Sequence, residues 1–190
     1  MKKIPIVLTA GLTIATAMGA FSLVAAAQTS TSNFYERTEV ARVDQGLRIA
    51  PVPLKYTKAD KYMVGLGSYL VNAVGDCSGC HTNPSFAPGG DPYLGQKKKV
   101  NSAHYLAGGQ LFGPFVSRNL TPEKNGLPAG HTFPEFLKII RTGIDLEHKH
   151  PQFGPLLQVM PWPTYQDMTD HELLAIYTYL KAIPPATPGK

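Results

Sequence analysis

The sequence is poor in cysteine and in charged residues, and each shortage excludes a class of protein. Only two cysteines occur among 190 residues, which excludes a small scaffold held together by several disulfides. Charged residues make up 16% of the chain. The formal net charge of +5 falls to about +3 without Lys2 and Lys3, which lie in a segment we expect to be removed, and this is too small to indicate a nucleic-acid-binding surface. Hydrophobic residues make up 43%, which is enough to bury a core and excludes wholesale disorder. We therefore expect one domain, or one domain plus extensions.

Long apolar runs are also missing, except at the N-terminus. There, Lys2 and Lys3 precede an uncharged stretch from Ile4 to Ala27 that ends in three alanines. This pattern predicts a cleaved signal peptide over residues 1–27, and hence a periplasmic protein whose mature chain has no membrane span. An uncleaved N-terminal membrane anchor is the alternative, because an uncharged stretch of this length could cross a bilayer.

The rest of the chain divides into an N-terminal arm over residues 28–58 and a domain over residues 59–186. The arm is polar at first, contains a candidate short helix over residues 36–48, and ends in an extended Pro-containing segment. The sequence predicts three helices in the domain, which begin at Asp60, Thr132 and Thr169. The two threonines each start a capping box.

A glycine inside the first predicted helix indicates how the helices pack. Gly67 costs a helix about 1 kcal/mol relative to alanine, so its presence suggests a close helix contact. The last predicted helix has a stripe of apolar residues that we expect to face it, with Tyr177 or Tyr179 as the aromatic neighbour. The members of this stripe are Leu173, Ile176, Tyr177 and Leu180.

Residues 82–130 are unlike the helical segments. Fourteen of these 49 residues are glycine or proline, so no long helix is expected. Because a loop of this length in a compact domain is usually functional, we expect it to enclose something. It also contains Lys97-Lys98-Lys99, which is either a solvated run or a docking patch for an acidic partner.

Both cysteines lie in one short motif, Cys77-Ser78-Gly79-Cys80-His81. Two thiols three positions apart can form thioether bonds to the two vinyl groups of one haem, and His81 can then bind the iron axially. Three alternatives fit less well. A thioredoxin-like pair needs a βαβ context, a disulfide leaves the histidine unexplained, and a zinc site needs a second ligand pair. The motif therefore predicts one covalently attached haem c.

The sixth iron position needs a ligand from elsewhere in the chain. Met160 is followed by proline in an apolar loop before the last helix, so its direction is fixed, and we take it as the axial ligand. A buried core methionine is the alternative. Met63 and Met168 are expected to be packing residues instead.

With this motif and a candidate axial methionine, the sequence resembles the monohaem class I-like c-type cytochromes. It is most similar to the cytochrome c units of periplasmic alcohol, gluconate and fructose dehydrogenases. The resemblance runs from about Tyr62 to Pro185 and rests on the haem motif together with several shorter segments. These are Gly67–Val71, Gly75–Thr82, Asn119–Pro122, Phe136–Gly143, Met160–Trp162 and Leu173–Pro185.

The resemblance implies Cys77 and Cys80 as thioether sites, His81 and Met160 as axial ligands, and Asn119 as a neighbour of the haem. Gly113-Pro114 resembles the Gly-Pro of many small cytochromes, in which a carbonyl accepts the free N–H of the haem histidine. Two arginines, Arg118 and Arg141, are candidate partners of the haem propionates.

Together these observations predict an all-α fold: three or more short helices with long Gly/Pro-rich loops around one haem. The expected function is one-electron transfer, not catalysis. The partners would be a periplasmic dehydrogenase as donor and a respiratory acceptor, with the chain acting as a free carrier or as the cytochrome subunit of the dehydrogenase. The alternative is a haem enzyme or sensor with an open distal site.

Overall fold

The computed structural model describes residues 36–147 and 150–189. Among the described residues, those from Ala41 onward belong to one compact unit, and residues 36–40 fall outside it. The predicted signal peptide lies outside the described residues, and the predicted domain boundaries stay predictions. Within the part that the structure describes, no helix is both long enough and apolar enough to cross a membrane.

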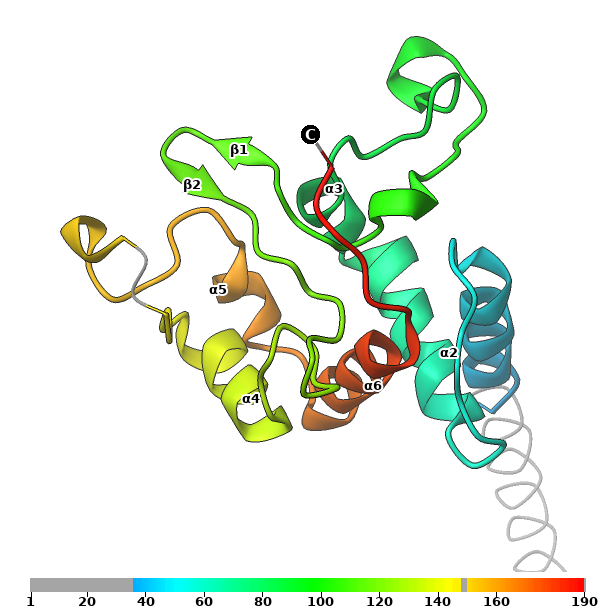
Figure 1. The fold of residues 1–190 in the computed structure, drawn as a ribbon. Helices are drawn as coiled ribbons and strands as arrows, with labels where there is room; N and C mark the ends of the chain where they lie inside the picture. Colours follow the sequence, from blue (N-terminus) through cyan, green and yellow to red (C-terminus); the bar gives the residue numbers. More distant parts are fainter. Residues whose placement is uncertain (1–35, 148–149, 190) are drawn as a thin grey trace, which may run out of the picture. The chain divides into compact units, whose positions relative to one another are not determined.

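The helix that leads to the cysteine motif has two parts (Figure 1). An α-helix, α2 (Lys61–Tyr69), continues into a single π-helical stretch, η1 (Leu70–Val74), which ends at Gly75. The helix predicted from Asp60 is therefore confirmed, but the predicted cap is wrong. The Asp60 carboxylate accepts a hydrogen bond from the Thr57 hydroxyl at 2.6 Å and none from the first turn of the helix.

The last helix, α6 (Asp170–Ala182), lies against α2 (Figure 1). At Gly67 the two backbones come so close that a Cβ atom would lie 2.0 Å from the Ala175 carbonyl oxygen and 2.7 Å from Tyr179 Cβ. The predicted close contact is thus confirmed, with Tyr179 as the aromatic neighbour.

The predicted stripe on α6 is wrong in one respect. Tyr177 does not face Gly67 but packs against Phe133 and Phe136 of α4 (Phe133–Thr142), at ring-centroid distances of 5.4 and 5.6 Å. Since α6 contacts both α2 and α4, it buries two faces, and a single apolar stripe does not describe it.

The two predicted capping boxes are present. The backbone N–H of Thr132 donates to the Glu135 carboxylate at 2.8 Å, and that of Thr169 donates to Glu172 at 2.9 Å. Each bond gives a free backbone donor a partner at the start of its helix. Helix α4 ends, as predicted, at Gly143, which adopts the left-handed conformation with φ 69°.

The helix predicted in the N-terminal arm is also present, over residues 36–49. From Ala41 onward its residues belong to the compact unit. A Cβ atom at Gly46 would lie 1.9 Å from the Gly65 carbonyl oxygen, and the Ser68 hydroxyl donates to the Gly46 carbonyl at 2.7 Å. This part of the arm therefore packs closely against α2.

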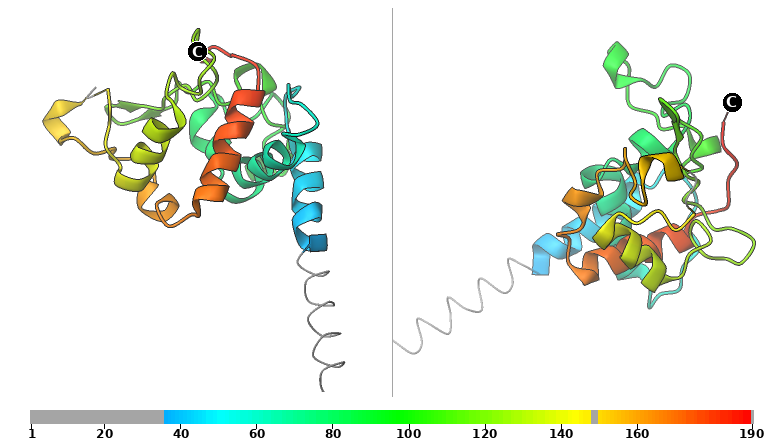
Figure 2. Two further views of the ribbon diagram at one scale, coloured as in Figure 1. Left: turned by 90° about the horizontal axis from the view of Figure 1, so that it is seen from below. Right: turned by 90° about the vertical axis from the view of Figure 1, so that its left-hand side faces the viewer.

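Residues 82–130 contain only short elements, as their glycine and proline content predicts (Figure 2). Strands β1 (Leu111–Phe112) and β2 (Phe115–Val116) form a two-stranded antiparallel hairpin. The remaining short elements of the domain are η2 (Pro92–Leu94), η3 (Ser102–His104), η4 (Pro151–Phe153), α3 (Cys77–His81) and α5 (Trp162–Tyr165). The described residues thus form a mostly helical domain, which confirms the predicted all-α class.

Candidate functional site

One helical turn, α3, carries all three residues of the predicted haem motif. Asp76 precedes this turn in the left-handed conformation, with φ 46°, and so separates it from the helix before. Cys77 and Cys80 are free thiols, and both are half-buried. Their spacing on one turn leaves two cysteine side chains and His81 within a single five-residue element.

The electrostatics of the two thiols argue against a redox-active pair. Burial, together with the neighbouring Asp76 carboxylate, raises the pKa of Cys77 to about 12. The same two causes, burial first, raise the pKa of Cys80. Both groups are therefore neutral thiols near pH 7, whereas redox-active cysteines typically have a lowered pKa. A zinc site would need further ligands close to the two thiols. In the described segments, no group of three or more His, Cys, Asp or Glu side chains is placed to hold a metal ion.

The environment of His81 fixes its tautomer. Its Nδ1 lies 2.7 Å from the main-chain carbonyl oxygen of Arg118. Because a carbonyl can only accept, Nδ1 carries the hydrogen and Nε2 keeps a free lone pair. Burial lowers the pKa of His81, so the ring stays neutral at pH 7. A neutral imidazole held by Nδ1 with Nε2 available is the form that binds haem iron.

This contact corrects one prediction. The carbonyl that accepts from His81 belongs to Arg118 and not to the Gly113-Pro114 segment. Pro114 is exposed in the turn that joins β1 to β2, because the hairpin between Leu111 and Val116 carries it away from α3.

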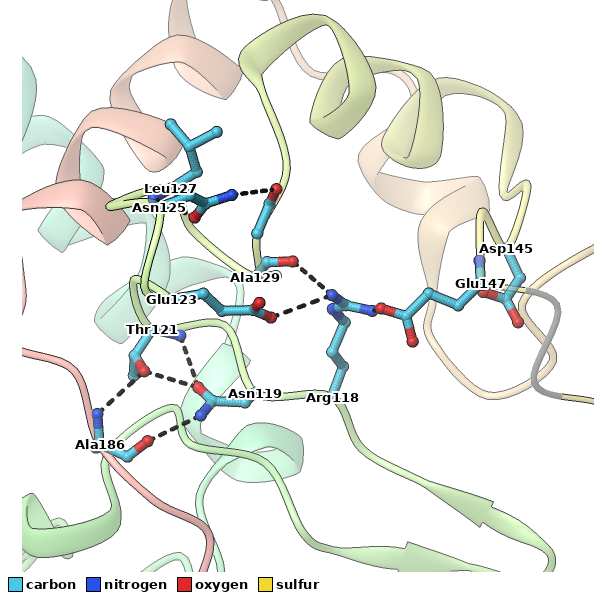
Figure 3. Close-up of polar contacts among 11 residues, drawn as sticks. Arg118, Asn119, Thr121, Glu123, Asn125, Leu127, Ala129, Asp145, Glu147 and Ala186 are labelled. Atoms are coloured by element: carbon cyan, nitrogen blue, oxygen red, sulfur yellow. Dashed lines mark hydrogen bonds and ion pairs between the residues drawn. The ribbon is translucent and has the colours of Figure 1, made fainter.

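The side chain of Arg118 anchors the segment whose carbonyl holds His81 (Figure 3). Its guanidinium donates to the Ala129 carbonyl and forms ion pairs with Glu123, at 3.4 Å, and with Glu147. Its Nε is buried and makes no hydrogen bond within the described residues. The N–H at this position is an unsatisfied donor. It could donate a hydrogen bond to a carboxylate, such as a haem propionate.

Asn119 fixes the same segment from the other side (Figure 3). Its amide nitrogen donates to the Ala186 carbonyl at 2.8 Å, and its amide oxygen accepts from the Thr121 backbone at 2.8 Å. The geometry therefore supports an indirect role for Asn119: it holds the backbone beside Arg118, whose carbonyl contacts His81.

Arg141 has partners within the protein. It donates to the Asp170 carboxylate at 2.6 Å and to the Gln166 carbonyl, so it joins α4 to the start of α6. Its predicted pairing with a haem propionate stays a prediction.

The loop that carries Met160 is attached to the haem motif through α5. The Tyr165 hydroxyl donates to the Gly75 carbonyl at 2.7 Å, two residues before Cys77. At the other end of α5, the Trp162 indole N–H donates to the Leu157 carbonyl at 3.2 Å. Met160 is half-buried and lies between Leu157 and Trp162, the two residues that the second bond joins.

The other methionines of the described chain are packing residues, as predicted. Met63 and Met168 both pack against a buried cluster that includes Leu66 and Ala175. Among the residues that the structure describes, Met160 is the one methionine that packs in neither buried cluster. Its role as ligand stays a prediction.

A buried polar network behind Cys77 was not predicted. The Tyr105 hydroxyl donates to the Asn72 side chain at 2.6 Å and lies 2.9 Å from the Tyr179 hydroxyl. Tyr105 is fully buried, and this burial raises its pKa well above the usual value. The network joins η1 to α6 next to Cys77, which packs against the same cluster. Its members are widely separated in the sequence and share no motif, so no sequence signal marks them.

Comparison with known proteins points to the same family as the motifs. No model of a known protein family matches the chain. The alcohol dehydrogenase (quinone) cytochrome c subunit of Gluconacetobacter polyoxogenes is 31% identical over 149 residues, which is 76% of this chain and 30% of that protein. The gluconate 2-dehydrogenase cytochrome c subunit of Pantoea cypripedii is 29% identical over 122 residues, 64% of this chain and 23% of that protein. The chain thus matches less than a third of each relative.

A third relative, the alcohol dehydrogenase (quinone) cytochrome c subunit of Gluconobacter oxydans, is 28% identical over 130 residues, 67% of this chain and 25% of that protein. The resemblance inferred from the motifs is therefore confirmed, because these relatives align with 122 to 149 residues of the chain. Over most of its length, this chain is similar to the cytochrome c subunits of bacterial alcohol and gluconate dehydrogenases.

Proposed function

We propose that this protein is a one-electron carrier with a single haem c. Cys77 and Cys80 would form the thioether bonds, and His81 and Met160 would be the axial ligands. The observation that carries the proposal is the state of His81. It is neutral and bonded through Nδ1, so that Nε2 is free for iron, and it shares one helical turn with two neutral thiols.

Residues of the chain would hold the two axial ligands of the haem in fixed positions. Bound haem supplies an iron that changes by one electron between its ferric and ferrous forms. The Arg118 carbonyl would keep the His81 ring in one orientation and make it a better electron donor. The anchors at Trp162 and Tyr165 would restrict the Met160 loop, and a fixed loop keeps the ligand set the same in both oxidation states.

A carrier role fits these residues better than catalysis. If His81 and Met160 both held the iron, no coordination position would remain for a substrate. The relatives are named as cytochrome c subunits of dehydrogenases, so we propose a periplasmic dehydrogenase as electron donor and a respiratory component as acceptor. The predicted signal peptide, residues 1–27, would direct the chain to that compartment.

The optical spectrum of the holoprotein tests this proposal against a haem enzyme or sensor with an open distal site. We expect the oxidised protein to show the weak near-red band of methionine bound to ferric iron, and the reduced protein not to bind carbon monoxide. A protein that lacks this band and binds carbon monoxide readily would have an open iron position and would support the alternative.

A further inference from the structure

The loop over residues 83–101, here called the basic loop, starts two residues after His81 and is attached to the haem motif. The Ser85 hydroxyl, at the start of the loop, lies 3.2 Å from the Gly79 carbonyl within that motif. At the far end, the Asn101 side chain donates to the Pro84 carbonyl at 3.0 Å, and its backbone N–H donates to the Ser85 carbonyl. Both ends of the loop therefore meet beside α3.

The basic loop is ordered along its length by its own hydrogen bonds. Ala87 and Lys99 are joined by a backbone hydrogen bond of 2.9 Å, and so are Lys99 and Gly90. Phe86 and Val100 form an isolated antiparallel bridge. The loop is thus a defined surface feature and not an open connection.

The basic loop carries two large hydrophobic side chains that the fold does not bury. Tyr93 is 87% exposed and Leu94 is 72% exposed. Both line a groove of about 480 Å³ whose other walls include Phe86 and Pro88, and the rings of Phe86 and Tyr93 lie 6.3 Å apart. Adjacent exposed apolar side chains beside a groove are typical of an interaction site.

Three lysines follow directly in the chain after Gln96, the last residue that lines the groove. Lys97, Lys98 and Lys99 are all exposed, and none forms an ion pair or a side-chain hydrogen bond with a described residue. The loop's one acidic residue, Asp91, accepts a hydrogen bond from the Tyr93 backbone N–H at 2.9 Å. With three lysines and one aspartate, the loop carries a formal charge of +2.

We propose that the basic loop is the docking surface for the redox partner, and that it binds an acidic protein segment carrying one exposed apolar side chain. The apolar side chain would enter the groove at Tyr93 and Leu94, and carboxylates around it would pair with the three lysines. This inference rests on the proposed function and specifies the chemistry of its partner. An apolar centre with a charged rim is the common design of transient interfaces, where charge steers the encounter.

The position of the loop suits electron transfer. Its base is hydrogen-bonded to the turn that holds Cys77, Cys80 and His81. Ser85, which makes this bond, also lines the groove, so a partner seated there would contact a residue that is bonded directly to the haem motif.

The probe for the test is a synthetic pentapeptide with four glutamates and a central phenylalanine. We would add it to the ¹⁵N-labelled holoprotein and follow the amide resonances. The expected result is a saturable shift confined to the basic loop. Changing all three lysines to glutamate (Lys97→Glu, Lys98→Glu, Lys99→Glu) should weaken binding about tenfold or more. Changing Tyr93→Ser and Leu94→Ser together should weaken it without any change in charge.

The matched control is the triple variant Lys55→Glu, Lys58→Glu, Lys61→Glu. These three lysines are also exposed, and the variant changes the net charge by the same amount elsewhere on the chain. The control should bind the peptide within about twofold of the wild type, because screening limits the reach of a surface charge to about 8–10 Å at moderate salt.

Four results would overturn the proposal. They are equal weakening by the control, shifts that map elsewhere, equal binding of the same peptide with lysines in place of glutamates, and binding of vesicles of anionic phospholipid through the loop without binding of the acidic peptide. Failure of the proposed function has a different signature. A chain that lacks covalent haem but still binds the peptide would contradict the proposed electron transfer and leave the docking surface in place. A chain that carries covalent haem but does not bind the peptide would contradict the docking surface and leave the proposed electron transfer in place.

Discussion

Replacing Gly67 with alanine should destabilise the protein by forcing its two main helices apart. The added Cβ atom would lie 2.0 Å from the Ala175 carbonyl oxygen and 2.7 Å from Tyr179 Cβ. Ordinary van der Waals contacts begin at about 3.4 Å, so α2 and α6 would have to separate by more than about 1 Å. The obstructing atom belongs to the main chain, which cannot turn aside as the tip of a side chain can.

The size of the effect follows from two opposing contributions. Overpacking a close contact costs about 1–3 kcal/mol, and a backbone obstruction favours the upper end. Alanine gains about 1 kcal/mol over glycine inside a helix. We therefore expect a net loss of about 2 kcal/mol. For a chain of this length, such a loss lowers the melting midpoint by about 4–8 °C.

Denaturation of the holoprotein, followed by circular dichroism in guanidinium chloride, measures this loss. The double variant Gly67→Ala, Ala175→Gly is the control. Since the Ala175 carbonyl remains in place, removing its methyl group should not restore stability. An unchanged midpoint for Gly67→Ala would refute the close packing, and full rescue by the second change would show that a side chain, not the backbone, is the obstruction.

Three further predictions concern the site. Met160→Ala should remove the near-red band, lower the reduction potential and let the reduced protein bind carbon monoxide, while Met168→Ala should do none of these; equal behaviour of the two variants would contradict the ligand assignment. Burial raises the pKa of Tyr165 to about 12, so the stability that its neutral hydroxyl contributes is present below pH 10 and lost between about pH 10 and 12. Tyr165→Phe should flatten that part of the stability–pH curve, and an unchanged curve would count against it. Arg118→Ala should loosen the carbonyl that holds His81 and raise the reduction potential, with partial recovery in Arg118→Lys; identical potentials in all three proteins would exclude this positioning role.

The parts of the fold that were predicted are those whose cause is local in the sequence. The helices from Thr132 and Thr169 begin with capping boxes that involve residues three positions apart. Gly67 indicated a close contact because glycine destabilises a helix interior and is often kept there for close packing. Only the placement of Tyr177 on the face of α6 that meets Gly67 was wrong, because Tyr177 packs against α4, a contact that the helix pattern does not contain.

The site was predictable to the extent that it lies in one motif. Cys77, Cys80 and His81 are adjacent, and the chemistry of their spacing can be read directly. The carbonyl partner of His81 was assigned to Pro114 by resemblance, and the structure places Arg118 there instead. Tyr165 was not predicted, because its bond to Gly75 joins residues 90 positions apart, and only the folded chain brings them together.

Mass spectrometry of the purified protein, produced together with a cytochrome c maturation system, tests the central claim most directly. We expect the mass of the mature chain plus one haem, retained after acid–acetone extraction. The variant with both Cys77 and Cys80 changed to serine should lack it, because thioether bonds need both sulfurs in place. A wild-type protein whose mass equals the polypeptide alone, or a double variant that keeps its haem through extraction, would contradict covalent attachment at this motif.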